Sequence, residues 1–374
     1  MNEQQQKAAQ ILFETYDQRV QDTSLTVETA WSNKLAGEAV IKRQGLLQDS
    51  DWTQLKDVPG DNSSWATYRQ ALRDITEQEN YPLIIGSNLI GNLNSYFIKN
   101  SITFNQCLLL IDKNVPNQLI SKITKSLNKK KIYQLKFKAS EKNKNIHHIN
   151  KILQILLSKN FSRQDCLITI GGGITGDVGG FAASLYKRGL NFINIPTTLL
   201  SQVDSCIGGK TGVNTKEGKN LLGSFYQPKM VISDIDFLKS LPKREIICGY
   251  GEILKHSLIL HKKFFEYLKT NFKKILDLES PFIEKAIYES CKIKKFVVQK
   301  DEKEKGIRKI LNFGHTFAHA FEATLGYSKK LNHGEAVILG IVAALKFSLN
   351  TKLITFQDHN KILKHIIDAK LPSN

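Results

Sequence analysis

The chain has 374 residues, of which 41% are hydrophobic and 24% charged, and it carries a formal net charge of +18. This length suffices for roughly two or three domains with cores of their own, and this composition excludes a wholly disordered protein. No run approaches the ~18 apolar residues of a membrane helix, and the N-terminus lacks the apolar core of a secretory signal. We therefore expect a cytoplasmic protein with no membrane partner.

The cysteines and the lysines exclude two further classes of protein. The five cysteines are scattered without a CxxC pair, which is typical of reduced thiols rather than of disulfides or a thiolate zinc site. The lysines are spread along the chain, and the one tight run, Lys129-Lys130-Lys131, is expected at the solvated end of a helix. We expect no nucleic-acid partner, because an anionic small substrate or a compositional bias explains the charge equally well.

A step in composition near residue 80 separates an N-terminal segment from the rest of the chain. Residues 1–79 hold 8 Lys/Arg and 13 Asp/Glu, whereas the remainder holds 45 and 22. All three tryptophans, Trp31, Trp52 and Trp65, precede residue 80, and all five cysteines follow it. We therefore interpret residues 1–79 as a separate N-terminal extension.

Two helices are predicted within this extension, at 4–20 and 65–77, so it is expected to be small and helical. The stretches Asp51-Trp52-Thr53-Gln54 and Trp65 to Thr76 resemble the C-terminal part of phage tail-fibre assembly proteins. A helical extension without such relatives is the alternative.

From Tyr81 onward, predicted strands alternate with predicted helices. Buried strands are predicted by three apolar runs, at 83–86, 107–112 and 166–170, and an amphipathic helix by Ile146 to Leu157. This alternation indicates a parallel sheet covered on both faces, and helical periodicity dominates from about Asp236. We expect an α/β nucleotide-binding domain over 80–235, followed by an all-helical metal- and substrate-binding domain over 236–374.

A glycine-rich turn follows the third of these strands. The run Gly171-Gly172-Gly173-Ile174-Thr175-Gly176-Asp177 fits G-x-G-x-x-G and leads into a predicted helix, Val178 to Tyr186. Glycines in this arrangement let backbone amides approach a pyrophosphate at a helix N-terminus. A tight turn without a ligand explains the motif equally well when it is taken alone.

The residues that follow favour a binding site. Two lysines have glycines beside them, in Gly208 to Asn214 and in Gly218-Lys219-Asn220, and both lie near Asp204 in sequence. Lysines beside an aspartate indicate a pocket that holds an anion next to an oxygen-rich ligand.

Four residues of the helical half are candidate metal ligands. Glu252 falls on a predicted helix, His315 and His319 are four residues apart on one side of another, and His333 follows. One carboxylate and two imidazoles suit a catalytic zinc with an open position. Spacing alone favours His315 with His319, and Glu252 or His333 as the third ligand. Each histidine alone is compatible with an ordinary helix residue, but the set together favours a metal site.

Residues 81 to about 345 resemble the 3-dehydroquinate synthase family throughout. The matching motifs are Gly171 to Asp177, Pro196 to Leu200, Val203 to Ser205, Gly208 to Gly212, Gly218 to Asn220, Glu252 to Lys255, Arg308 to Thr316 and His333 to Val337. The resemblance implies a homodimeric lyase of the shikimate pathway of aromatic amino-acid biosynthesis, with NAD and zinc or cobalt as cofactors. Its substrate would be 3-deoxy-D-arabino-heptulosonate 7-phosphate, and its products 3-dehydroquinate and phosphate.

The resemblance also implies roles for individual residues. Zinc would be held by Glu252, His315 and His333, so His319 would contact substrate instead. The other substrate contacts would come from Asp204, Lys210, Lys219, Asn220, Lys255, Lys294, Arg308 and Asn312. NAD contacts would come from Asp112, Asn114, Glu141, Lys144, Gly172, Gly173, Asp177, Thr197, Thr198, Leu200, Lys210 and Lys219.

The family's chemistry explains this set of residues. NAD⁺ transiently oxidises one hydroxyl, which acidifies the neighbouring C–H and allows phosphate to leave. The carbonyl is then reduced again, the sugar ring opens, and an intramolecular aldol reaction closes the carbocycle. NAD is regenerated in every turnover, so the enzyme is a lyase.

Two features depart from the family. Residues 1–79 have no counterpart in it, and the sequence ends at Asn374, before a family segment with Asp-Lys-Lys whose lysine meets the substrate phosphate. We expect impaired turnover from the second departure. The alternatives are another sugar-phosphate cyclase, a metal-dependent polyol dehydrogenase of the same fold, or an inactive fusion fragment. Lys294, Arg308 and Asn312 favour an acidic substrate, and therefore the first interpretation.

Overall fold

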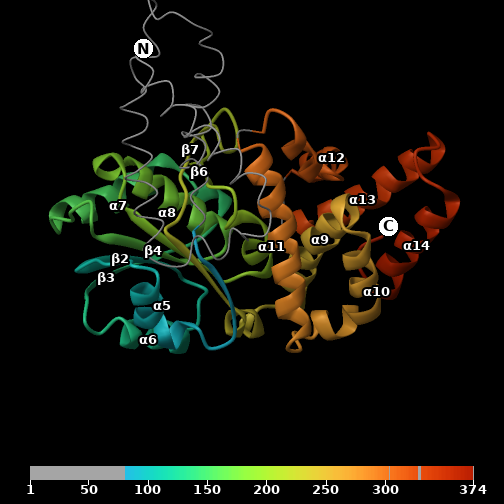
Figure 1. The fold of residues 1–374 in the computed structure, drawn as a ribbon. Helices are drawn as coiled ribbons and strands as arrows, with labels where there is room; N and C mark the ends of the chain where they lie inside the picture. The colour runs from blue at the N-terminus through green and yellow to red at the C-terminus, as the bar shows by residue number, and fades with distance from the viewer. Residues whose placement is uncertain (1–80, 303, 327–329, 374) are drawn as a thin grey trace, which may run out of the picture. The chain divides into compact units, whose positions relative to one another are not determined.

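The computed structural model describes residues 81–302, 304–326 and 330–373 (Figure 1). The helices expected at 4–20 and 65–77, the resemblance within 51–76 and the three tryptophans lie outside these residues. None of the described helices is long and apolar enough to cross a membrane.

A six-stranded parallel sheet forms the centre of the N-terminal half, in the order β1-β8-β5-β4-β2-β3. The strands are β1 (Leu83–Gly86), β2 (Gln106–Asp112), β3 (Lys131–Phe137), β4 (Cys166–Gly171), β5 (Asn191–Pro196) and β8 (Met230–Asp234). The three strands predicted from apolar runs are confirmed as β1, β2 and β4. Each matches its prediction to within one residue at either end. For β2 and β4 the apolar runs are buried on both faces of the sheet, whereas β1 is only partly buried.

Helices cover both faces of this sheet, as Figure 1 shows. Alternate side chains of β2 point to opposite faces, so Leu109 joins the core beneath α5 and α6 while Leu108 joins the core beneath α7 and α8. The bounds of these helices are α5 (Leu93–Lys99), α6 (Asn117–Ser126), α7 (Ile146–Ser158) and α8 (Gly173–Leu185). The helix expected at 146–157 is confirmed as α7.

The start of α8 corrects one prediction. The helix expected at 178–186 begins five residues earlier, at Gly173, because Gly173 and Gly176, which were taken for part of a turn, lie inside its first turns. A side chain at Gly179 would place its Cβ 2.1 Å from Thr169 Cγ2 of β4, so glycine here permits close helix–strand packing. Gly179, which lies inside the predicted helix as well, therefore serves helix–strand packing.

The strand order creates a switch point between β2 and β4. From β2 the chain continues to β3 on one side, whereas from β4 it continues to β5 on the other. The carboxyl ends of β2 and β4, at Asp112 and Gly171, therefore lie where the connections diverge. In open α/β sheets, ligands bind at such a point.

Short elements connect the sheet to the helical half. An antiparallel pair, β6 (Lys210–Val213) and β7 (Leu222–Phe225), was not predicted and packs against α8. The remaining short helices are η2 (Ile90–Asn92), η3 (Glu141–Asn143), η4 (Tyr186–Arg188), η5 (Ser201–Ser205), η6 (Ile235–Ser240) and η7 (Ile307–Asn312). The run Lys129-Lys130-Lys131 follows α6 as a turn and starts β3, so it lies just beyond the helix end on which it was expected.

In the described residues after β8, all regular secondary structure is helical, as predicted from about Asp236 onward. They are α9 (Lys243–Leu260), α10 (Lys262–Leu276), α11 (Phe282–Lys300), α12 (His315–Thr324), α13 (His333–Asn350) and α14 (Phe356–Asp368). One hydrophobic core extends from Leu199 and Val231 of the α/β part into these helices. The expected boundary at 235/236 therefore marks a change of secondary structure within continuous packing.

Candidate active site

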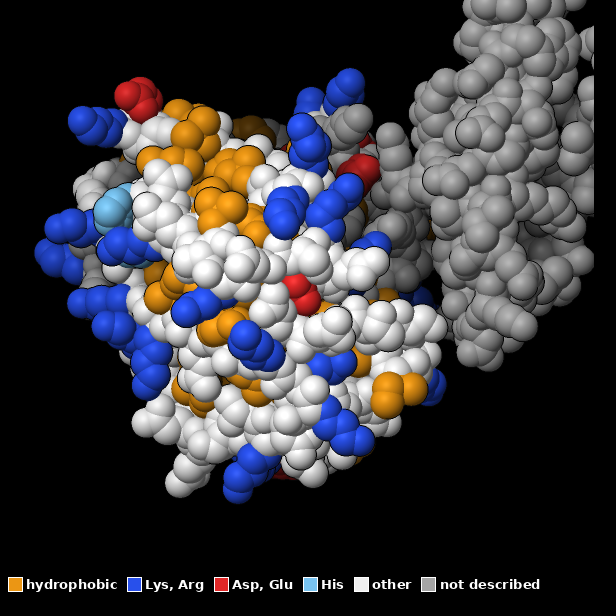
Figure 2. All heavy atoms as spheres, turned by 90° about the vertical axis from the view of Figure 1, so that its left-hand side faces the viewer, with side chains coloured by type: hydrophobic (Ala, Val, Ile, Leu, Met, Phe, Trp, Pro, Cys, Tyr) orange, Lys and Arg blue, Asp and Glu red, His pale blue; other side chains and the backbone are white. Residues whose placement is uncertain are grey.

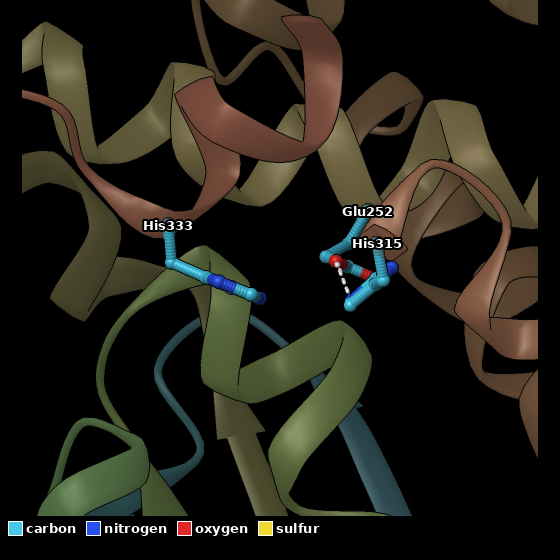
Figure 3. Close-up of side chains that lie close together, drawn as sticks. All are labelled: Glu252, His315 and His333. Carbon is cyan, nitrogen blue, oxygen red and sulfur yellow. Dashed lines mark ion pairs between the residues drawn. The ribbon is translucent and has the colours of Figure 1, made fainter. Parts of the chain in front are cut away.

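Three side chains from three helices meet in the helical half (Figure 3). Glu252 lies in the middle of α9, His315 is the first residue of α12, and His333 is the first residue of α13. One potential ligand atom from each lies within 4.8 Å of the others. His315 Nε2 is 3.7 Å from Glu252 Oε1, and the His333 ring points toward this pair.

Close backbone contacts between the helices bring these residues together. A Cβ at Gly334 would lie 2.2 Å from Cys248 O, and one at Gly251 would lie 2.9 Å from Gly334 O, so α9 and α13 touch through their backbones. A Cβ at Gly340 would lie 2.1 Å from Gly314 O, where α13 meets the start of α12. Each of the three side chains is next to one of these glycines in sequence, because only glycine allows so close an approach.

Both imidazoles are oriented through Nδ1. His315 Nδ1 lies 3.3 Å from the carbonyl oxygen of Phe313, and His333 Nδ1 lies 3.3 Å from Glu322 Oε1. An acceptor at Nδ1 holds the proton there and leaves the Nε2 lone pair free. This is the tautomer in which histidine binds a metal through Nε2.

The carboxylate of Glu252 is fully buried, and neither of its oxygens accepts a hydrogen bond within the described part of the chain. Burial alone would raise its pKa, but the adjacent Lys255 ammonium, with which it forms an ion pair, brings the pKa below its usual value. Lys255 already gives this carboxylate one cationic partner, and its remaining lone pairs, beside two imidazoles, are available to a metal ion. This donor set therefore fits a zinc-type ion.

A second acidic group borders the first. Asp204 and His256 lie within ligand distance of Glu252 and of each other. The Lys294 ammonium donates to Asp204 Oδ1 at 2.7 Å, and despite burial this contact keeps the pKa of Asp204 well below its usual range. Because Lys294 already forms an ion pair with Asp204, a second metal ion beside the first is disfavoured here.

His319 lies beside the cluster and does not belong to it. Its ring centroid is 5.6 Å from that of His315 and 6.4 Å from that of His333, and its side chain is exposed. The structure thus groups the three residues that the resemblance implied, whereas the spacing of four had favoured His315 with His319. Packing of α13 against the start of α12 decides the grouping, and a single-helix spacing pattern does not contain that information.

Several of the expected substrate residues are buried cations. Lys255, Lys294 and Arg308 are at most 7% exposed. The Asp301 carboxylate holds the loop before η7 by accepting hydrogen bonds from three backbone amides, among them that of Arg308 at 3.0 Å. A Cβ at Gly208 would collide with the Arg308 guanidinium, which explains a glycine with φ +96 at that position.

Glu304 joins two further expected residues, and sequence reasoning missed it. It forms an ion pair with Lys210, and Asn312 Nδ2 donates to its Oε1 at 3.1 Å. Glu322 and Asp301 were also missed. All three acidic residues act on partners that are remote in sequence or on backbone amides, so no local motif marks them.

At the sheet, several of the residues expected to bind NAD lie around the switch point. Gly172 caps α8, and Thr197 N donates to Gly171 O at 2.9 Å, which ties the ends of β4 and β5 together. Asn114 N donates to Asp112 Oδ1 at 3.1 Å at the end of β2. The side chain of Thr198 packs near Gly172, with 3.3 Å separating Thr198 Cγ2 from an added Cβ.

A buried lysine connects this region with the loop after β6. Lys144 Nζ donates to Asp177 Oδ2 at 2.5 Å and to Asn220 Oδ1 at 2.6 Å. Burial raises the pKa of Asp177 to about 6, although Lys144 opposes this shift. Glu141 accepts from Asn214 Nδ2 at 2.8 Å, whereas Lys219 and Asn220 are exposed residues of the β6–β7 connection, and Leu200 lies between β5 and η5.

Family models of known proteins match most of the described chain. The family model described as "3-dehydroquinate synthase N-terminal" matches residues 134–248, and the one described as "3-dehydroquinate synthase C-terminal" matches 249–374. A third family model, "Phage tail assembly chaperone protein", matches residues 36–88. That match ends inside the described part of the chain, where β1 pairs with β8 of the sheet.

Individual proteins are also similar to this chain in sequence or in structure. A 3-dehydroquinate synthase from Pelagibacter ubique is 64% identical over 297 residues, which are 79% of this chain and 81% of that protein. A 2-deoxy-scyllo-inosose synthase, solved with carbaglucose-6-phosphate, NAD⁺ and Co²⁺, has a TM-score of 0.71 and 27% identity, covering 77% of each chain. A 2-epi-5-epi-valiolone synthase from Streptomyces hygroscopicus, solved with NAD⁺ and Zn²⁺, shares the fold at a TM-score of 0.72 and 24% identity, covering 79% of this chain and 82% of its own.

Proposed function

This chain belongs to the 3-dehydroquinate synthase family, and we propose that it converts 3-deoxy-D-arabino-heptulosonate 7-phosphate to 3-dehydroquinate and phosphate. The observation that carries the proposal is the meeting of Glu252, His315 and His333 beside buried lysines and an arginine. A metal-type donor set next to several cations suits a substrate with hydroxyls and two anionic groups. NAD and zinc or cobalt are the proposed cofactors.

The metal would be held by Glu252, His315 and His333. When bound, it supplies Lewis-acid polarisation of the hydroxyl that is oxidised and of the carbonyl that results. The chain's own contribution is orientation: the Nδ1 contacts of the two histidines keep their Nε2 atoms available, and Lys255 offsets part of the Glu252 charge. His319, exposed beside the cluster, would contact substrate.

NAD would bind at the switch point of the sheet. The amides at Gly172 and Gly173 begin α8 and would face the pyrophosphate, a position that the helix dipole favours. Asp112, Asn114 and Glu141 would bind the cofactor at one side of this turn. Its other contacts would come from Lys144, Asp177, Thr197, Thr198, Leu200, Lys210 and Lys219.

The substrate's anionic groups would bind to Lys294, Arg308 and Asn312, with Lys210, Lys219 and Asn220 closing the site. Lys294 is fixed by Asp204, and the Arg308 loop is fixed by Asp301, so these cations are held in place before substrate binds. Charged donors held in advance convert binding energy into orientation of the reacting carbons. This arrangement supports an acidic phosphorylated substrate over an uncharged polyol.

We also propose the larger organisation that the sequence indicated: an extension over 1–79, an NAD-binding domain over 80–235 and a metal-binding domain over 236–374. A homodimer is proposed from the resemblance. A cytoplasmic location fits the five cysteines, which are free and buried. Figure 2 shows one face of the molecule, on which many Lys and Arg side chains lie among uncharged ones, and a small anionic substrate is the partner that we propose for this charge.

The test is phosphate release from the keto-acid phosphate by the full chain with NAD and Zn²⁺ or Co²⁺. Release should require both cofactors, and NADH should not accumulate, because the hydride returns to the product in each turnover. Steady NADH accumulation from an uncharged polyol would instead support a dehydrogenase. Glu252→Gln serves as the control for adventitious phosphatase activity, since a contaminating phosphatase would be unaffected.

A further inference from the structure

Glu322 connects two of the three helices that form the metal-type cluster. It lies on α12 seven residues after His315, so His315, His319 and Glu322 share one face of this helix. Its Oε1 is 3.3 Å from Nδ1 of His333, which is the first residue of α13. One helix thus supplies both a candidate ligand and the partner of a ligand on the next helix.

The contact has the properties of a fixed hydrogen bond. The Glu322 side chain is 12% exposed, and that of His333 is 38% exposed. A glutamate carboxylate of ordinary pKa, about 4.3, is ionised at neutral pH. An ionised carboxylate only accepts hydrogen bonds, and therefore the proton of a neutral His333 ring stays on Nδ1.

The two histidines of the cluster differ in this respect. His315 Nδ1 faces a backbone carbonyl, that of Phe313, which carries no net charge and cannot be removed by a side-chain substitution. His333 Nδ1 faces a full negative charge, which makes the ring a stronger donor at Nε2. Of the two rings, His333 is therefore the one whose basicity and orientation depend on a replaceable side chain.

We propose that Glu322 is a positioning residue of the metal centre, which fixes the tautomer and ring orientation of His333 and thereby tightens divalent-metal binding. This inference rests on the proposed function, because it presupposes that His333 is a ligand. Loss of such an outer partner typically weakens metal affinity about 10–100-fold.

The test uses the full chain with Co²⁺ as the probe. Dissociation constants are measured by competition with a chromophoric chelator, and the visible spectrum of the bound Co²⁺ reports its surroundings independently of activity. Glu322→Gln keeps size and shape, but its amide can donate to Nδ1 and so favours the wrong tautomer. Glu322→Asp retains the charge on a shorter side chain. Glu266→Gln is the matched control, because it removes a carboxylate that pairs with Lys361 on another part of the surface.

We expect Glu322→Gln to weaken Co²⁺ binding about 10–100-fold and to change its spectrum, Glu322→Asp to recover part of the affinity, and Glu266→Gln to match the parent chain. Circular dichroism melting of each variant checks that it is folded. Parent-like Co²⁺ affinity and spectrum in a folded Glu322→Gln variant would overturn the inference and leave the proposed function intact. Failure of the parent chain itself to bind Co²⁺ would count against both.

Discussion

The α/β half and the helical half of this chain build their candidate sites in different ways. At the sheet, several of the residues expected to bind NAD, among them Asp112, Gly172 and Thr197, lie at the ends of neighbouring strands, and the positions of these residues follow from strand order. In the helical half, the cluster needs α9, α12 and α13 to cross at backbone contact. Topology positions the first site, whereas tertiary packing positions the second.

This difference has a consequence for substitution. A site at strand ends rests on a sheet that many other residues stabilise, so a local change should alter ligand binding and little else. A site at helix crossings depends on a few glycine contacts, so a change that touches no candidate ligand should still disturb it. The predictions below test this contrast.

The largest effect is expected from removing a ligand of the helical cluster. Glu252→Gln and His333→Ala should each weaken metal binding by more than the roughly 100-fold that loss of an outer partner can cost, while NAD affinity stays unchanged. Metal content after gel filtration and NAD titration measure the two effects, and His147→Ala is a control histidine on α7. Full zinc occupancy in both variants would mean that these residues do not hold the metal.

A smaller effect is expected from the packing glycines. Gly334→Ala would place a Cβ 2.2 Å from Cys248 O, and since a backbone carbonyl cannot rotate away, α13 must move. We expect a loss of about 3 kcal/mol in the free energy of unfolding, the upper part of the usual range for overpacking. Metal affinity should fall as well, although no ligand atom is altered.

Urea denaturation and Co²⁺ titration measure both effects of Gly334→Ala. Gly91→Ala is the matched control, because its added Cβ would meet only Asn88 Oδ1, at 3.8 Å. Equal stability of the two variants would show that the helix crossing tolerates displacement, and the contrast between the two halves would then fail.

The sequence predicted the elements of the α/β half well because their signals are local. Three apolar runs gave β1, β2 and β4, and an amphipathic pattern gave α7. The predicted start of α8 was wrong because Gly173 and Gly176, read as part of a turn, already lie in the helix. The β6–β7 pair was missed because two short strands rich in glycine and polar residues carry little hydrophobic pattern.

The helical site was predictable only in part. Spacing identified His315 and His319 as a same-face pair, which is true of α12, but it carries no information on which helix meets that face. The three-residue grouping came from the family resemblance, and its role in metal binding stays a prediction. Glu322 and Glu304 could not be predicted from the sequence, because a glutamate on a helix or loop is not marked by any local motif.

In the α/β half, Gly173→Ala should weaken NAD binding about tenfold, or about 1.4 kcal/mol. Its Cβ would lie 2.9 Å from Ser205 Oγ, a side chain that can rotate, so the stability of the fold should change little. NAD titration and urea denaturation measure the two quantities, with Gly91→Ala again as control. A large loss of stability without loss of NAD affinity would reverse the expected behaviour of the strand-end site.

The smallest effect is expected from deleting residues 1–79. Every candidate ligand and NAD residue follows Tyr81, and the charge balance and the tryptophans change at the same point. Dissociation constants for Co²⁺ and NAD should therefore stay within about twofold, or about 0.4 kcal/mol, of the parent values. Because residues 66–374 contain no tryptophan, limited proteolysis between Asp57 and Tyr81 should leave a tryptophan-free core wherever the cut falls after Trp65, and NAD should not alter the tryptophan fluorescence of the full chain. A fluorescence response to NAD would mean that the extension contacts the strand-end site, so this site would depend on more than the sheet.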